Sequence, residues 1–192
     1  NDKVGLIVFA GDAYVQLPIT TDYSSAKLFL SNITTDIMPV QGTAIGSAIQ
    51  LAIKSFTPET ETSKAIIVIT DGENHQDDAV SAAKQAKEKG IMVHTIGMGL
   101  EQGAPIPVKG QSGQFMKDGN GSIVVSKLDE KTLQEVAKAG EGLYVRASNT
   151  NVGLDQLLDE INQMEKNLLE ERIYTDYAEK YQYFLLAGLF FI

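Results

Sequence analysis

The first 150 positions alternate between short apolar runs and longer segments in which apolar residues recur every three or four positions. The short runs are rich in β-branched side chains and predict strands, whereas the wider spacing predicts amphipathic helices. The predicted strands are 4–10, 13–17, 65–70, 91–96 and 143–146. The predicted helices are 24–33, with a serine as N-cap, 44–56, 75–90, and 129–140, with Asp129 and Gly140 as caps.

The order of these elements predicts the fold class. Strands and helices alternate from the second helix onward, as in βαβ units that build a parallel sheet. Only Gly11-Asp12 separates the first two strands, so these strands form a hairpin and an antiparallel edge. We therefore expect an α/β fold with a doubly wound, mostly parallel, Rossmann-like sheet. The continuous apolar run at 65–69 predicts a strand that is covered on both faces.

Three further segments complete the predicted organisation. The domain spans residues 1–150 and carries a hairpin excursion at about 105–125 that turns at residues 118–121. Residues 151–180 follow a helical stripe of leucines with acidic residues between them, which predicts an amphipathic helix. Residues 181–192 carry no charge but are fewer than the roughly 20 that span a bilayer, which indicates the start of a transmembrane helix. We expect a fragment that is truncated at both ends, because the chain lacks an initiator Met and stops inside this apolar run.

Composition excludes several classes of function. The formal net charge of -9 and the lack of a Lys and Arg cluster exclude a nucleic-acid surface. The absence of cysteine excludes disulfides, thiolate metal sites and cysteine catalysis. The sequence contains neither a GxxxxGK[ST] loop nor a GxSxG elbow, so nucleotide-binding and hydrolase functions lack their motifs. His94 lies within a strand pattern, which favours a packed side chain over a metal ligand.

The strongest candidate chemistry belongs to Thr43 and Asp71. Asp71 follows a buried strand, and the carboxyl ends of parallel strands are where ligands bind in such folds. A hydroxyl and a carboxylate are hard oxygen ligands that suit Mg²⁺. Gly42, Gly72 and Glu73 are expected close to the ion without contacting it. The alternative is that Thr43 only caps its helix and Asp71 only caps its turn.

Three segments, DKVGLIVFAGDAYVQLPITTD, QGTAIGSAIQLAI and AIIVITDGEN, resemble in this order the von Willebrand factor type A domain. More closely they are similar to its membrane-anchored bacterial subgroup associated with aerotolerance operons, the Bat proteins. Members of this family bind metal through a DxSxS loop, a threonine and an aspartate in what is called a metal-ion-dependent adhesion site. The threonine corresponds to Thr43 and the aspartate to Asp71, whereas the first strand and the DxSxS loop have no counterpart in this chain.

The resemblance implies a non-catalytic domain for protein binding, either adhesion or scaffolding, in a membrane-anchored bacterial protein. In the intact protein, Thr43 and Asp71 are expected to hold Mg²⁺, Mn²⁺ or Ca²⁺. A protein partner that offers an acidic residue, or another Bat-type protein, then completes the coordination. The implied location is the bacterial inner membrane, with the domain in the periplasm. Because the DxSxS oxygens are missing, we expect the chain as given to bind no metal.

The missing strand is central in the family's sheet, so its absence leaves two unpaired edges. We expect residues 181–192 of the same or a neighbouring chain to fill this place, or two copies to pair there as a dimer or by strand exchange. Two other functions stay open. One is a metal-independent structural scaffold. The other is a metal-dependent phosphoesterase that uses Asp71, Glu73 and either Asp77 or Asp78, although the sequence does not supply the additional ligands that it needs.

Overall fold

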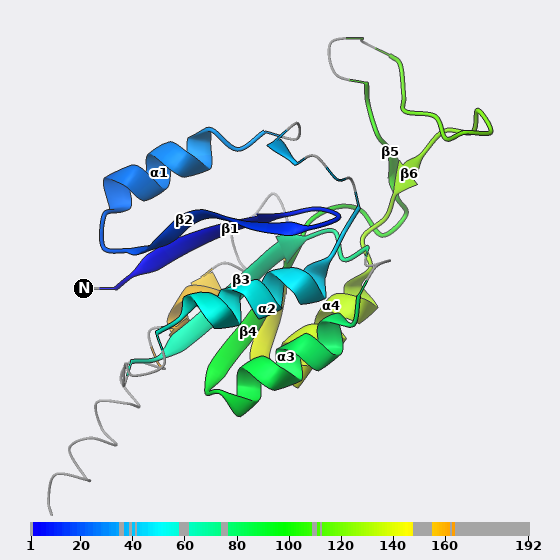
Figure 1. Cartoon of the computed structure of the whole chain (residues 1–192). Helices are drawn as coiled ribbons and strands as arrows, with labels where there is room; N and C mark the ends of the chain where they lie inside the picture. The colour runs from blue at the N-terminus through cyan, green and yellow to red at the C-terminus, as the bar shows by residue number, and fades with distance from the viewer. Residues whose placement is uncertain are drawn as a thin grey trace, which may run out of the picture.

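The computed structural model describes residues 2–34, 37–38, 40, 42–57, 62–73, 77–108, 111, 113–147, 155–161 and 163. Strands and helices follow one another in the order shown in Figure 1. The strands are β1 (Val4–Phe9), β2 (Ala13–Thr20), β3 (Lys64–Thr70), β4 (Ile91–Gly97), β5 (Ala104–Pro105), β6 (Val125–Ser126) and β7 (Glu141–Arg146). The helices are α1 (Tyr23–Ser31), α2 (Ile45–Ser55), α3 (Ala79–Glu88) and α4 (Glu130–Ala139), and residues 155–161 are also helical.

The central sheet is parallel and has the strand order β3-β4-β7. β1 and β2 pair antiparallel as a separate hairpin, with Phe9 opposite Ala13 across the turn. The predicted α/β class, with a parallel sheet and antiparallel strands, is therefore confirmed. Among the described residues, however, the hairpin is separate from the parallel sheet and does not form the predicted antiparallel edge. Each parallel connection passes through a helix, so the carboxyl ends of β3, β4 and β7 meet at one edge of the sheet.

The main core lies between the parallel sheet and the helices α2, α3 and α4, which Figure 1 shows on one face of it. Ile45 and Ile49 of α2 and Leu133 of α4 are fully buried there, against Val68 and Val93 of the sheet. These apolar stripes are the ones that the three-four spacing predicted. The core fixes the ends of the helices relative to the carboxyl edge of the sheet.

The opposite face of β3 is exposed, so the prediction that this strand is covered on both faces is wrong. Ile67 and Ile69 are 43% and 57% exposed, although they belong to the continuous apolar run. On that face, the helix at residues 155–161 places Leu157 against Ile96 and Val145 of β4 and β7. Among the residues that the structure describes, nothing equivalent covers β3.

The β1–β2 hairpin is attached to the rest of the domain ahead of α2. The backbone N–H of Ala44 donates to the carbonyl of Ala10 over 2.7 Å, and Gly11 N–H donates to Val40 O over 3.1 Å. Phe9 packs against the main core. Within the described ranges, no strand pairing joins this hairpin to the parallel sheet, so one edge of β3 is unpaired.

The first helix differs from its prediction in its cap. Asp22, rather than a serine, is the N-cap, and its carboxylate accepts hydrogen bonds from the N–H groups of Ser24 and Ser25. This correction follows from the stronger acceptor lying one residue ahead of the first helical position. None of the residues of α1 is fully buried, and Leu28 and Leu30 are largely exposed.

A long excursion, residues 98–127, leaves the sheet after β4 and returns before α4; we call it the arm. Figure 1 shows its strands β5 and β6 projecting away from the sheet. The predicted turn at 118–121 is a tight one, in which Asp118 accepts hydrogen bonds from the N–H groups of Asn120 and Ser122. Pairing of Lys117 with Ile123 closes the strands on either side of it.

The C-terminal predictions fall largely outside the described residues. Of the helix predicted over 151–180, the structure describes residues 155–161 and 163, and the segment 181–192 is not described at all. No helix in the described ranges is long and apolar enough to cross a membrane. The amphipathic helix beyond residue 163 and the transmembrane segment therefore stay predictions.

Candidate functional site

Asp71 lies immediately after β3, at the carboxyl edge of the parallel sheet, and is half-buried. Its Oδ2 accepts a hydrogen bond of 2.8 Å from the hydroxyl of Ser126, at the base of the arm. Its Oδ1 has longer contacts, 3.3 Å from the N–H of Glu73 and 3.5 Å from the hydroxyl of Thr70. One carboxylate oxygen is thus held firmly, whereas the other is only weakly bonded and can accept a further ligand.

The turn around Gly72 requires glycine. Its φ of +82° lies in the left-handed region, and an added Cβ would stand 2.6 Å from the carbonyl oxygen of Asp129. Asp129 N–H in turn donates to Asp71 O over 2.8 Å. The carboxylate of Glu73 accepts a hydrogen bond of 3.1 Å from the N–H of Lys127. The turn is therefore fixed against both the arm and the start of α4.

Thr43 precedes α2 and is half-buried. The N-cap residue of α2 is Ala44, which makes no side-chain capping bond, so the alternative in which Thr43 caps this helix is not what the structure contains. Gly42, with φ of 136°, supplies a backbone conformation that other residues rarely adopt. In Figure 1, the N-terminal end of α2 points toward the same edge of the sheet as the carboxyl ends of β3 and β4.

Asp77 caps α2 from a distant part of the chain. Its two carboxylate oxygens accept hydrogen bonds of 2.8 Å from Gly46 N–H and 2.7 Å from Ser47 N–H. An added Cβ on Gly46 would lie 2.9 Å from the Cγ of Asp77, so glycine makes this approach possible. The carboxylate offsets the positive end of the helix dipole, which would otherwise repel a cation bound at Thr43.

Two residues of the phosphoesterase alternative serve as helix caps. Asp77 caps α2, and Asp78 caps α3 by accepting a hydrogen bond of 2.9 Å from Ser81 N–H. Groups of three or more His, Cys, Asp or Glu side chains that could hold a metal are absent from the part of the chain that the structure describes. The hydroxyl of Thr43 and the free lone pairs of Asp71 Oδ1 still fit Mg²⁺ in kind, as hard oxygen ligands, but they form only part of a coordination set.

His94 is packed inside the sheet, as predicted. The side chain is fully buried, and its Nδ1 accepts a hydrogen bond of 3.0 Å from Leu143 N–H. Nε2 has no hydrogen-bond partner among the described residues. Burial lowers the pKa of the imidazole, and the charge of Glu160 raises it to a smaller extent. His94 therefore satisfies a backbone amide at the irregular β4–β7 pairing rather than serving as a ligand.

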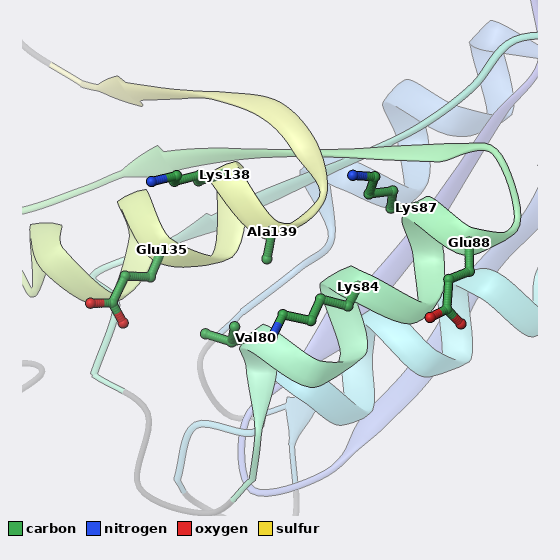
Figure 2. A pocket seen from close by; sticks show the side chains of 7 residues that line it. All are labelled: Val80, Lys84, Lys87, Glu88, Glu135, Lys138 and Ala139. Atoms are coloured by element: carbon green, nitrogen blue, oxygen red, sulfur yellow. The ribbon is translucent and has the colours of Figure 1, made fainter.

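A groove of about 660 Å³ between α3 and α4 shares no residue with this site. Figure 2 shows lysine and glutamate side chains along both of its walls. Lys87 is already paired with Glu141 over 2.8 Å, and the mixture of charges is that of a solvated helix surface. The residues that line the groove are Val80, Lys84, Lys87, Glu88, Glu135, Lys138 and Ala139.

Sequence reasoning missed Ser126 and the role of Asp77. Ser126 is 55 positions from Asp71, and Asp77 is 30 and 31 positions from the amides that it caps. The only available signal for Ser126 was topological: the arm leaves after β4 and must return to the same edge of the sheet before α4.

Residues 1–160 match the von Willebrand factor type A domain family. The chain belongs to this family. Its resemblance to Bat-type members is also confirmed by two solved structures. BatB from Bacteroides thetaiotaomicron, a conserved hypothetical protein, is 54% identical with a TM-score of 0.83, over 86% of this chain and 80% of that one. An aerotolerance-related membrane protein from Bacteroides fragilis is 52% identical with a TM-score of 0.81, over 85% of this chain and 81% of that one.

A more distant structure shares the fold alone. Proximal thread matrix protein 1 from the mussel byssus is 18% identical with a TM-score of 0.54, over 85% of this chain and 34% of that one, and zinc occupies its metal-ion-dependent adhesion site. The chain spans about half the length of the curated relatives that it matches.

Proposed function

We propose that this chain is a non-catalytic, protein-binding domain of a membrane-anchored bacterial protein, and that it recognises an acidic residue of a protein partner through a divalent cation. One observation carries the proposal: Asp71 stands at the carboxyl edge of a parallel sheet with one oxygen held by Ser126 and the other only weakly bonded. The weakly bonded oxygen is the feature that favours a cation, since a carboxylate oxygen is a hard ligand that suits Mg²⁺.

Each residue of the site has a distinct part in this proposal. Thr43 and Asp71 hold Mg²⁺, or Mn²⁺ or Ca²⁺, through oxygen, and Ser126 keeps the Asp71 carboxylate in one orientation. Asp77 offsets the helix dipole beside the cation. When bound, the cation supplies the positive charge that attracts a partner's Asp or Glu. Further oxygen ligands, such as those of a DxSxS loop, are needed to hold the ion at the unpaired edge of β3.

A metal-independent scaffold is the second candidate function, and a specific observation favours it. The carboxylates of both Asp71 and Glu73 already bond to the base of the arm. This arrangement stabilises the turn without any metal, so the family's ligand residues would be retained for structure alone.

The proposed membrane location is based on proteins that are similar to this chain. The Bacteroides fragilis protein that is 52% identical is described as a membrane protein related to aerotolerance. We propose the bacterial inner membrane as the location, with the domain in the periplasm and residues 181–192 as the start of an anchor. Other Bat-type proteins, or a protein that offers an acidic residue, are the partners proposed.

A metal titration of the full-length protein separates adhesion from scaffold. Thermal unfolding of the wild type, Asp71→Ala and the matched control Asp2→Ala is followed as Mg²⁺ is added. Adhesion predicts that Mg²⁺ raises the Tm of the wild type and of Asp2→Ala but not of Asp71→Ala. A folded wild type whose Tm does not respond to Mg²⁺, Mn²⁺ or Ca²⁺ overturns the metal bridge and leaves the scaffold.

A further inference from the structure

The arm carries several exposed apolar side chains. Six of them, from both of its ends and from its strands, are between 39% and 51% exposed. They are Met98, Leu100, Phe115, Met116, Ile123 and Val125. Single exposed apolar residues on a surface need no explanation, whereas several on one projecting segment can contribute to an interaction surface.

Backbone hydrogen bonds join the described strands of the arm to one another. Ile106 N–H donates to Val124 O over 3.1 Å, and Met116 N–H donates to Ile106 O over 2.8 Å. Val124 N–H in turn donates to Met116 O over 2.8 Å. A surface that is fixed by backbone hydrogen bonds loses little conformational entropy when a partner binds to it.

The base of the arm is continuous with the candidate metal site. Ser126 donates to the carboxylate of Asp71, and Lys127 donates through its N–H to the carboxylate of Glu73. A ligand that lies along the arm therefore ends next to Asp71. The arm also differs in charge from the rest of the chain, since it holds three lysines and two acidic residues in a protein of net charge -9.

We infer that the arm forms the second half of the binding surface and contacts a segment of a partner protein in which apolar side chains flank an acidic residue. The inference rests on the proposed function, because the acidic residue of the partner is taken to bind the cation at Asp71. The apolar neighbours pack on Met116 and Ile123, and the balance of charge on the arm admits an acidic segment that the remaining surface repels.

A lipid bilayer is a less suitable occupant. The turn at residues 118–121 is polar, and the carboxylate of Asp118 is bonded within it. Met116 and Ile123 flank this turn in the sequence, so their insertion into the hydrocarbon region would bring the charged Asp118 close to it, at a cost in free energy.

The test uses the full-length protein and a random dodecapeptide library displayed on phage. Peptides are selected on the wild type in Mg²⁺, and the affinity of the enriched peptides is measured for three variants. Met116→Ser/Ile123→Ser removes two exposed apolar side chains from the arm. Leu28→Ser/Leu30→Ser is the matched control, because it removes two exposed apolar side chains from α1. Asp71→Ala removes the proposed metal ligand.

The expected result is enrichment of peptides that place an Asp or Glu beside apolar residues. The arm variant is expected to weaken their binding about tenfold or more, and the α1 variant less than about twofold. Equal binding to the wild type and the arm variant, or no enrichment of such peptides, overturns the inference. Loss of binding with Asp71→Ala alone supports the metal site but not the arm, whereas loss with the arm variant alone supports the arm but not the metal bridge.

Two further measurements distinguish a protein partner from a lipid bilayer and from a second copy of this chain. Sedimentation with phosphatidylglycerol vesicles that requires Met116 and Ile123 would assign the arm to membranes and overturn a protein partner. Self-association of the wild type that the arm variant abolishes would assign it to a second copy of this chain, with the same consequence. Thermal unfolding of each variant confirms that the comparison is made on folded protein.

Discussion

The hydroxyl of Ser126 donates a hydrogen bond of 2.8 Å to Oδ2 of Asp71, although 55 positions separate the two residues. This bond joins the arm to the turn after β3 and orients the carboxylate that the family resemblance identifies as a metal ligand. Because Ser126 holds Oδ2, the other carboxylate oxygen of Asp71, Oδ1, is the one that can bind a cation. Four predictions follow from this and related contacts.

Ser126→Ala is expected to lower the free energy of unfolding by about 1 kcal/mol, because a half-buried carboxylate oxygen loses its charge-assisted hydrogen bond. Urea unfolding of the purified protein measures the effect. Ser126→Thr keeps the hydroxyl and should lie closer to the wild type. If both variants unfold at the wild-type urea concentration, the bond does not contribute to stability.

Asp77→Ala is expected to destabilise the protein by about 2 kcal/mol, more than an ordinary helix cap, because two partly buried N–H groups lose a charged acceptor. Asp78→Ala provides the matched control, since it removes one exposed capping bond from α3 and should cost about 1 kcal/mol. Circular dichroism during urea unfolding compares the two. A larger effect at Asp78 would contradict the role given to Asp77.

Gly72→Ala and Gly90→Ala separate backbone strain from steric overlap. Both glycines have positive φ, +82° and +69°, but an added Cβ meets Asp129 O at 2.6 Å only at Gly72, whereas nothing lies within 4 Å of it at Gly90. Gly90→Ala should therefore cost about 1 kcal/mol, and Gly72→Ala about 3 kcal/mol or more. Differential scanning calorimetry shows whether the two values differ in this order.

The pH dependence of stability reports on His94. Because burial lowers its folded-state pKa below the ordinary value of 6.5, the unfolded state binds the proton more readily. Stability is therefore complete above about pH 6.5 and falls as the pH drops below it, by at most about 1.4 kcal/mol per pH unit. Protonation of Nδ1 would also break the bond from Leu143 N–H.

Urea unfolding at pH 7.5 and pH 5.5 measures this loss. His94→Asn, which keeps a hydrogen-bond acceptor but does not titrate, should flatten the difference between the two pH values. His75→Gln removes the other histidine of the sequence and should leave the difference in place. If the difference between the two pH values disappears in His75→Gln and not in His94→Asn, His75 and not His94 causes the pH dependence.

The sequence was sufficient for the elements that local patterns determine. The strands and helices, the cap at Asp129 with Gly140 at the other end of its helix, and the left-handed Gly90 all depend on residues close in sequence. The position of Asp71 at the carboxyl edge followed from the alternation of strands and helices. Periodicity and turn chemistry carry this information because they act within a few residues.

The contacts that the sequence left open are those between distant segments. Nothing near Ser126 or Asp77 distinguishes these residues from ordinary surface side chains, and their roles appear only when the arm and the start of α2 come together with their partners. The exposure of Ile67 and Ile69 could not be predicted either, since a continuous apolar run shows only that a strand can be covered and not which segments cover it.

The cap that Asp77 provides has a consequence for binding in the cell. The first amides of a helix are a natural site for phosphate and other small anions. In α2, Gly46 and Ser47 have already given their N–H groups to a carboxylate from the same chain. A small anion therefore finds these two amides of α2 already occupied, so the carboxylate of Asp77 excludes it from them.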